Sequence, residues 1–137
     1  MNHLPHGRID TWAEGNLVYA IFIGQMNLEG ITIGLDSVRK VIEELNGAPF
    51  TMLNDTLEVE GGTPEAYEEL EQFNQWLNTQ PLIAKATIIS SKLQLKLINT
   101  LIKARKEQNN QTFANQVEAV EWLNSEFKAK IKVTHRD

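Results

Sequence analysis

The segment from Leu82 to Ile89 constrains the fold more than any other part of the chain. It is nearly continuously apolar, and it is bounded by Pro81 on one side and by Ser90 on the other. A strand-sized run of this kind is typical of a strand covered on both faces, as in parallel sheets flanked by helices. We therefore expect a central strand here, within an α/β fold.

The segments around this strand alternate between the strand period and the helix period. Residues 8–14 and 17–24 flank a turn signal and predict an opening β-hairpin, with shorter strands at 49–53 and 112–114. Apolar residues recur every three to four positions in four other segments, and they predict helices that begin near residues 28, 64, 92 and 116. The order β-β-α-β-α-β-α-β-α implies a mixed sheet of about five strands, parallel after its first pair.

Helix caps support these boundaries. Thr63 followed by Pro64 is typical of a helix start, and Asn115 with Glu118 has the residue types of a capping box. Ser90 or Ser91 is the expected cap of the third helix. At three positions the sequence does not decide which of two neighbouring residues faces inward. The pairs are Leu93 or Gln94, Leu97 or Ile98, and Leu101 or Ile102.

Composition excludes several classes of protein. The 137 residues contain no cysteine, which rules out disulfides, thiolate nucleophiles and cysteine-ligated zinc. The net charge of −5 disfavours nonspecific nucleic-acid binding, and no apolar run approaches the ~20 residues of a membrane span. Without a signal-peptide pattern, we expect a cytoplasmic protein. We expect one domain over residues 1–137, with flexible ends at about 1–6 and 131–137.

Three segments carry a resemblance to a known family. They are Phe22 to Gly30, Leu53 to Ala66, and Thr112 to Leu123, the last of which includes the pattern Ala-x-x-Trp-Leu. Over roughly residues 7–128 the chain resembles the SpoIIAA-like (STAS-type) family, whose fold is also compared with the CRAL-TRIO lipid-binding fold. The resemblance implies a SpoIIAA/STAS-like fold and a non-enzymatic role in protein interaction.

The chain departs from the family at the regulatory loop. STAS regulators carry a phosphorylatable serine in an Asp-Ser-Ser-Gly type segment, and the matching region here, Asn54 to Pro64, contains no serine. Its only hydroxyl groups are those of Thr56 and Thr63. The resemblance therefore does not extend to a phosphorylation switch.

The same region is the candidate interaction or anion site. A loop that meets a helix N-terminus has free N–H groups and a favourable dipole, which together can hold an anion. The residues concerned are Asp55, Thr56, Gly61, Gly62 and Thr63. No nucleotide-binding fingerprint occurs. The three histidines, His3, His6 and His135, lie near the chain ends, so the sequence predicts no catalytic residue, metal site or cofactor.

A candidate interface follows from charge and aromatic residues. The second helix carries four glutamates and no cation, whereas the third carries several lysines, so complementary faces are available for a partner. Trp76 and Trp122 adjoin the apolar stripes of their helices, where partial burial or an interface is expected. The candidate interface residues are Trp76, Lys92, Lys96 and Trp122.

Three functions remain open from the sequence. The leading hypothesis is a non-enzymatic interaction or regulatory module, acting on a protein partner or by self-association. The first alternative is a carrier of a small apolar or lipid-like ligand. An enzyme is the third, because carboxylates and hydroxyl groups can act in pockets that a sequence does not reveal.

Overall fold

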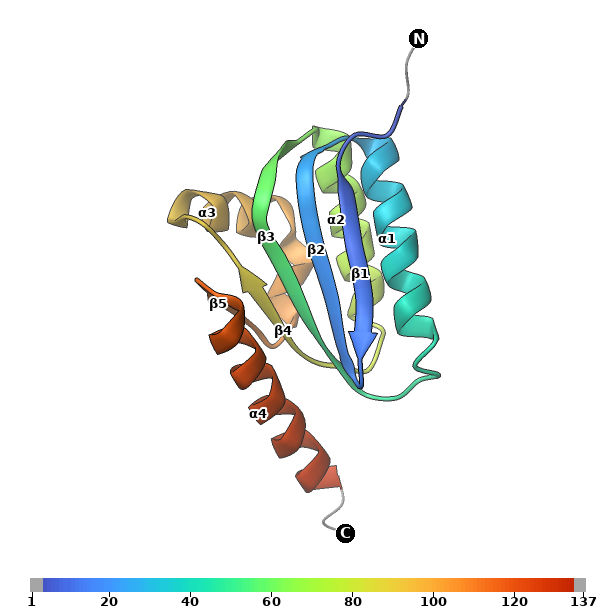
Figure 1. The fold of residues 1–137 in the computed structure, drawn as a ribbon, viewed down its shortest axis with the longest axis vertical. Helices are drawn as coiled ribbons and strands as arrows, with labels where there is room; N and C mark the ends of the chain where they lie inside the picture. The colour runs from blue at the N-terminus through green and yellow to red at the C-terminus, as the bar shows by residue number, and fades with distance from the viewer. Residues whose placement is uncertain (1–3, 135–137) are drawn as a thin grey trace.

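The computed structural model describes residues 4–134, which form a single five-stranded sheet with helices on both faces (Figure 1). The strands are β1 (Arg8–Glu14), β2 (Leu17–Met26), β3 (Phe50–Gly62), β4 (Leu82–Ile88) and β5 (Asn110–Phe113). The helices are α1 (Leu28–Glu43), α2 (Pro64–Leu77), α3 (Lys92–Leu101) and α4 (Gln116–Thr134), with a 3-10 helix, η1 (Lys103–Glu107), before β5. No helix in these residues is long and apolar enough for a bilayer crossing.

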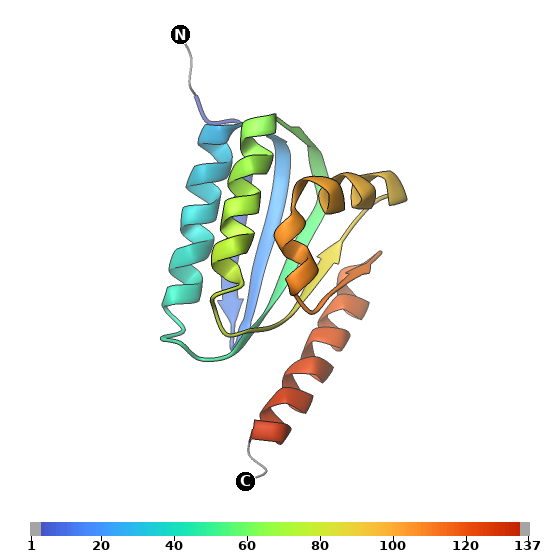
Figure 2. The same ribbon diagram turned by 180° about the vertical axis from the view of Figure 1, so that it is seen from behind.

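The sheet has the strand order β1-β2-β3-β4-β5, in which only the β1–β2 pair is antiparallel. Successive parallel strands are neighbours, and the right-handed crossover rule then places their connecting helices on one face. Figure 2 shows α1, α2 and α3 with η1 on that face, and α4 lies on the other. The predicted order and the mixed sheet are confirmed, but the middle position belongs to β3 and not to β4.

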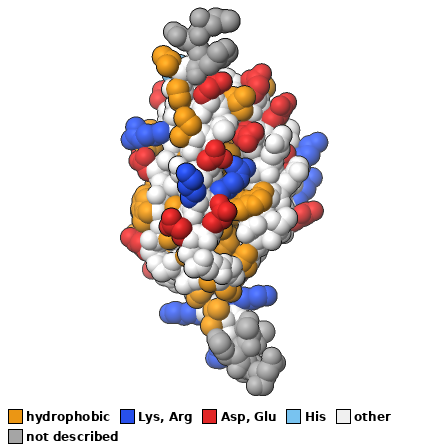
Figure 3. Space-filling view, turned by 90° about the vertical axis from the view of Figure 1, so that its right-hand side faces the viewer, with side chains coloured by type: hydrophobic (Ala, Val, Ile, Leu, Met, Phe, Trp, Pro, Cys, Tyr) orange, Lys and Arg blue, Asp and Glu red, His pale blue; other side chains and the backbone are white. Residues whose placement is uncertain are grey.

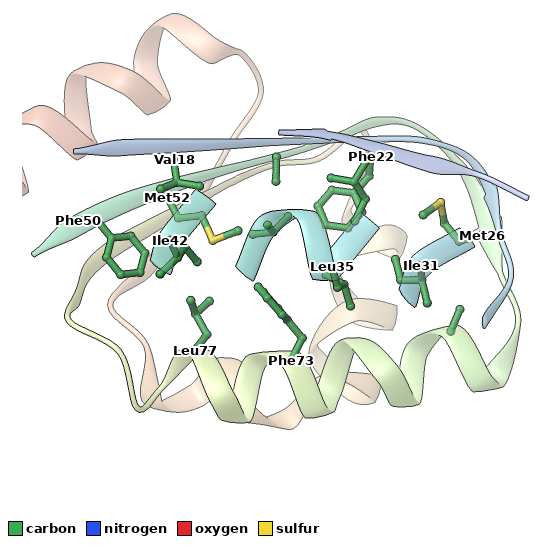
Figure 4. Close-up of a cluster of buried hydrophobic side chains, with 14 residues drawn as sticks. Val18, Phe22, Met26, Ile31, Leu35, Ile42, Phe50, Met52, Phe73 and Leu77 are labelled. Carbon is green, nitrogen blue, oxygen red and sulfur yellow. The ribbon is translucent and has the colours of Figure 1, made fainter. Parts of the chain in front are cut away.

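The larger hydrophobic core lies between the sheet and helices α1 and α2 (Figure 4). Phe22 and Met52 reach from the strands toward Leu35 of α1 and Phe73 of α2. Each of these side chains is almost completely buried, and burial of a large apolar side chain contributes about 1.5–3 kcal/mol. This core packs α1 and α2 on the same face of the sheet.

The smaller core lies on the opposite face, under α4. Ala119 and Leu123 of α4 pack on alternate residues of β4, which are Ala84, Ala86 and Ile88. Since strand side chains alternate between the two faces, Lys85 and Thr87 of the same strand must point the other way, toward α2 and η1. The two-sided cover predicted for this strand is therefore correct.

Strand β3 is longer than the sequence suggested. Residues 54–62, expected as a loop, continue the strand and pair with β2 as far as Gly62 opposite Met26, with register shifts on the way. The long β2 gives the polar half of β3 a backbone partner, which a local sequence pattern does not reveal. Residues 54–62 are thus part of the sheet and not a loop, and they lead directly into α2.

The third helix ends at Leu101, earlier than the sequence predicted. Ile102 leaves the helical region with φ −116° and ψ 78°, and η1 then turns back toward the sheet. Gln94, Ile98 and Ile102 form the inward face, whereas Leu93, Leu97 and Leu101 are 78%, 45% and 40% exposed. The break brings Arg105 of η1 inside, where it is only 4% exposed.

At the N-terminal end of the described residues, the backbone of Leu4 and of His6 is tied to the start of α1. Asn27 caps α1 and its side chain also hydrogen-bonds the backbone of Leu4 and of His6. Gly30 makes this approach possible, because a Cβ there would collide with the carbonyl oxygen of His6. At the other end α4 continues to Thr134, while residues 1–3 and 135–137 lie outside the described part.

The surface on the side of β1 and α1 is of mixed charge. Figure 3 views the molecule from this side, where acidic and basic side chains are interspersed with small apolar areas. On α1 this mixture includes the pair Arg39 and Asp36, whose Nη1 and Oδ1 lie 2.9 Å apart. No charge of one sign dominates this face, and the functional site lies elsewhere.

Candidate functional site

A cavity lies between the sheet and the layer formed by α2, α3 and η1. Its volume is about 70 Å³. On the same scale, one water molecule occupies roughly 10–15 Å³. Strands β2, β3 and β4 form its floor, and the break after α3 supplies its far wall. The cavity therefore sits where two crossover connections, through α2 and through α3 with η1, meet on one face of the sheet.

Most of the cavity wall is apolar. Helices α2 and α3 contribute Ala66, Leu70 and Ile98, and β2 contributes Phe22 and Met26. Tyr67 also lines the wall, and burial raises the pKa of its phenol above the ordinary value of 10.0. These surfaces suit the apolar part of a small molecule.

Lys85 lies at the polar end of the cavity and is only 1% exposed. Its Nζ donates a hydrogen bond of 2.7 Å to the Oδ1 of Asn74 on α2. Burial lowers the pKa of Lys85 well below its ordinary value of 10.5, and the nearby charge of Arg105 lowers it further. Within the described residues no carboxylate forms an ion pair with this lysine.

Arg105 is the second buried cation of the cavity. Its Nη1 donates to the Oδ1 of Asn99 at 2.7 Å, whereas its Nη2 is buried and has no protein partner. Burial lowers the pKa of Arg105 below its ordinary value. In the described part of the chain Arg105, too, has no acidic residue as an ion-pair partner.

Two further polar atoms of the cavity are buried without a protein partner. They are the Oγ1 of Thr87 on β4 and the Oδ1 of Asn54 on β3. A hydroxyl group can donate or accept, and an amide can turn to present either its oxygen or its nitrogen. Because buried polar groups normally have partners, three such groups in one small cavity make it the candidate binding site of the described residues.

Helix α3 and η1 are fastened over the cavity by side-chain hydrogen bonds. Gln94 of α3 donates its Nε2 to the backbone oxygen and to the hydroxyl of Thr56 on β3, each at 3.2 Å. The Oε1 of Glu71 on α2 accepts from the backbone N–H of Ala104 at 2.9 Å. This bond is the main cause that lowers the pKa of Glu71. Among the described residues, few hydrogen bonds join α3 to the rest of the protein. Helix α3 is therefore the element that covers the site.

A surface groove between α2 and α3 leads toward the cavity. Its walls include Glu68 and Gln72 of α2 and Leu97 and Leu101 of α3. The residues Gly61, Gly62 and Tyr67 line both the groove and the cavity. These three residues therefore form the boundary between the groove and the cavity.

Known proteins resemble this chain in fold. No family model matches it, and no curated protein matches it. Among solved structures, an uncharacterised DUF3478-family protein with a SpoIIAA-like fold, from Shewanella loihica PV-4, aligns with a TM-score of 0.61 at 14% identity. The alignment covers 90% of this chain and 98% of that chain. This chain has a SpoIIAA-like fold. The similarity confirms the fold expected from the sequence, and at this identity it concerns the fold alone.

The SpoIIAA-like fold brings together some residues of the predicted anion site and separates others. Thr56, Gly61 and Gly62 line the cavity. Thr63 instead accepts the N–H of Ala66 at 3.2 Å as the cap of α2, and the carboxylate of Asp55 accepts the N–H of Leu57. The predicted segment is thus one wall of the site, and its role in binding stays a prediction.

The candidate interface residues lie apart from the cavity. Lys92 and Lys96 are exposed on the outer side of α3. Trp76 is half-buried beside Phe73, with their ring centroids 5.6 Å apart, and Trp122 is half-buried beside Phe113. Much of each tryptophan side chain is therefore buried in a hydrophobic core, and its part in an interface stays a prediction.

Sequence reasoning missed the two residues that dominate the site. Lys85 is the one charged residue in the apolar run of β4, and a charge in a strand covered on both faces is a usable signal. Arg105 carries no such signal, because its burial depends on the break at Ile102. No three His, Cys, Asp or Glu side chains of residues 4–134 gather to hold a metal ion.

Proposed function

We propose that this chain is a non-enzymatic binding module that holds a small, partly apolar molecule in the cavity beneath α3. The observation that carries the proposal is the combination of an apolar wall with a cluster of buried polar groups at one end. Ligand sites are typically built in this way, with a mostly apolar lining and a few convergent polar groups. Of the functions left open by the sequence, the geometry favours the small-ligand carrier.

The lining of the cavity supports binding over acid–base catalysis. Its polar members are Lys85, Arg105, amides and hydroxyl groups, and the described lining contains no carboxylate, histidine or cysteine. A general acid and base of differing pKa is the usual arrangement for acid–base catalysis. A buried lysine of lowered pKa, such as Lys85, is instead the type of group that acts as a nucleophile toward a carbonyl. The groups present here can hold and orient a molecule.

Three small probes of matched shape test the proposal, namely butyrate, 1-butanol and butylammonium. We expect at least one of them to shift the amide resonances of β4 and α3 in a titration followed by NMR. Ile98→Trp fills the cavity from α3 and should abolish the shifts. Leu95→Trp is the control, because Leu95 is half-buried on the same helix but does not line the cavity.

Native mass spectrometry of the gently purified protein complements the titration. A retained mass that is lost under denaturing conditions, and that is absent from Ile98→Trp, supports a resident ligand. If the protein carries no such mass and none of the three probes binds, the proposal is wrong.

A second role, self-association, is favoured by the outer face of α3. Its leucines at 93, 97 and 101 are exposed, and Lys92 and Lys96 run beside them. Helix α2 offers the complementary charge, with glutamates at 65, 68, 69 and 71 and no cation. We propose that α3 of one copy packs on α2 of a second copy, as opposite charges favour.

Sedimentation equilibrium tests this second role. Leu97→Lys should weaken the dimer at least tenfold, and higher salt should weaken the wild-type dimer as well. Val117→Lys on α4 is the control, since Val117 is 70% exposed and α4 lies on the opposite face of the sheet from α3. A wild-type protein that stays monomeric at several hundred micromolar would contradict the role.

A further inference from the structure

We infer that the ligand of the cavity is a small monocarboxylate with a short apolar tail, its carboxylate held between Lys85 and Arg105. The inference rests on the proposed function, because it names the chemical class of the molecule that the cavity binds. Three independent features support it: charge, unpartnered donors, and size.

Charge is the first argument. Lys85 and Arg105 are 1% and 4% exposed, they face the same cavity, and no ion pair joins either to a described carboxylate. Buried charges in proteins are normally paired, since an unpaired one is costly. Two adjacent cations repel each other as well. One bound anion pairs with both cations and offsets their repulsion, whereas a neutral or cationic ligand does neither.

Hydrogen-bond donors are the second argument. The Nη2 of Arg105 and the hydroxyl of Thr87 are buried without protein partners, and Asn54 can turn its amide nitrogen toward the same space. Arginine and lysine donors make strong, charge-assisted bonds to carboxylates. The Nη1 of the guanidinium donates to Asn99, and the Nη2 stays available for the ligand.

Size and wall chemistry are the third argument. A cavity of 70 Å³ has room for roughly five waters, which corresponds to about four to six non-hydrogen atoms. Leu70, Ile98 and Phe22 form much of the remaining wall and offer no partner to a second polar group. A phosphate dianion would place acceptor oxygens against this apolar wall, whereas a monocarboxylate places an alkyl chain there.

The three charge-matched probes decide between the ligand classes. Wild-type protein should bind butyrate at least tenfold more tightly than 1-butanol, and butylammonium should not bind. Lys85→Met should lower the butyrate affinity at least tenfold and leave the 1-butanol affinity within twofold. Lys128→Met removes an exposed lysine of α4 that does not line the cavity, and it should change neither affinity.

Thr87→Val provides a second variant, should Lys85→Met fail to fold. It removes an unpartnered hydroxyl at nearly constant shape, and we expect a severalfold loss of butyrate affinity with 1-butanol unaffected. The inference is overturned if 1-butanol binds as tightly as butyrate, or if inorganic phosphate binds more tightly than butyrate. Tight binding of 1-butanol leaves the proposed function standing, whereas tighter binding of phosphate also contradicts its partly apolar ligand. Binding of no probe, together with no retained mass, removes the proposed function itself.

Discussion

The Nζ of Lys85 donates to the Oδ1 of Asn74 at 2.7 Å, and this bond joins the sheet to α2 inside the cavity. The same oxygen accepts from the Nε2 of Gln108 at 3.0 Å, and the amide nitrogen of Asn74 donates to the carbonyl of Leu70. Both lone pairs of the Asn74 oxygen are therefore engaged. The lysine still has donors to offer, because an ammonium group has three and the described residues supply it with one acceptor.

Lys85→Met should raise the stability of the ligand-free protein at neutral pH. The folded-state pKa of Lys85 lies well below 10.5, so between that pKa and 10.5 the folded protein holds fewer protons than the unfolded chain. The stability of the wild type therefore rises with pH across this window, and the penalty of the buried lysine is complete below it. Methionine removes the penalty, and we expect a gain of about 1–2 kcal/mol.

Urea unfolding followed by circular dichroism at several pH values checks this prediction. The gain should be largest at neutral pH and should shrink as the pH approaches 10.5. Lys128→Met, which removes an exposed charge on α4, should leave stability within about 0.5 kcal/mol. A Lys85→Met protein less stable than the wild type at neutral pH would show that the lysine is well compensated.

Asn74→Leu should destabilise the fold by about 2–4 kcal/mol, because it leaves the Nζ of Lys85 and the Nε2 of Gln108 without their acceptor. In the Lys85→Met background the same change should cost less, since only Gln108 then loses a partner. A double-mutant cycle on unfolding free energies measures the difference. Equal costs in the two backgrounds would show that the bond between Lys85 and Asn74 contributes nothing.

The elements that the sequence predicted well are those whose cause is local. The stripe of α2 with its cap Thr63, and the apolar run of β4, depend on neighbouring residues alone. The second half of β3 was missed because its stability depends on pairing with β2, more than thirty residues earlier. A partner distant in sequence leaves no trace in local periodicity.

The candidate site was only partly predictable for the same reason. Thr56, Gly61 and Gly62 were singled out by turn chemistry before a helix, and they do line the cavity. Lys85 stands out only when the strand around it is known to be buried on both faces. Arg105 becomes a site residue because Ile102 breaks the helix and η1 turns inward, which follows from tertiary packing.

Gly30→Ala should destabilise the protein by about 1–3 kcal/mol, the usual cost of overpacking. The added Cβ collides with the backbone oxygen of His6, and a backbone atom moves aside less readily than a flexible side chain. Glu43→Ala, at an exposed position of α1, is the control and should change stability by less than about 0.5 kcal/mol. Thermal unfolding compares the two variants, and a Gly30→Ala protein as stable as the control would show that the N-terminal segment relaxes freely.

Butyrate affinity should fall as the pH rises from the neutral range toward 10.5. A carboxylate beside Lys85 favours the charged ammonium, so the bound state has a higher lysine pKa than the free state, in which burial and Arg105 lower that pKa. Between these two pKa values binding takes up a proton, and affinity is lost by at most about tenfold per pH unit.

The other ionisable groups of the cavity should not produce this slope. Arg105 keeps its charge despite its lowered pKa, since arginine stays protonated in proteins, and the pKa of Tyr67 is raised above 10.0. Asn54, Asn74 and Thr87, which line the cavity from β3, α2 and β4, do not ionise. Dissociation constants measured by NMR between pH 6.5 and pH 9.5, with buffer ionic strength held constant, give the slope, which Lys85→Met should flatten. An affinity independent of pH in the wild type would place the carboxylate away from Lys85.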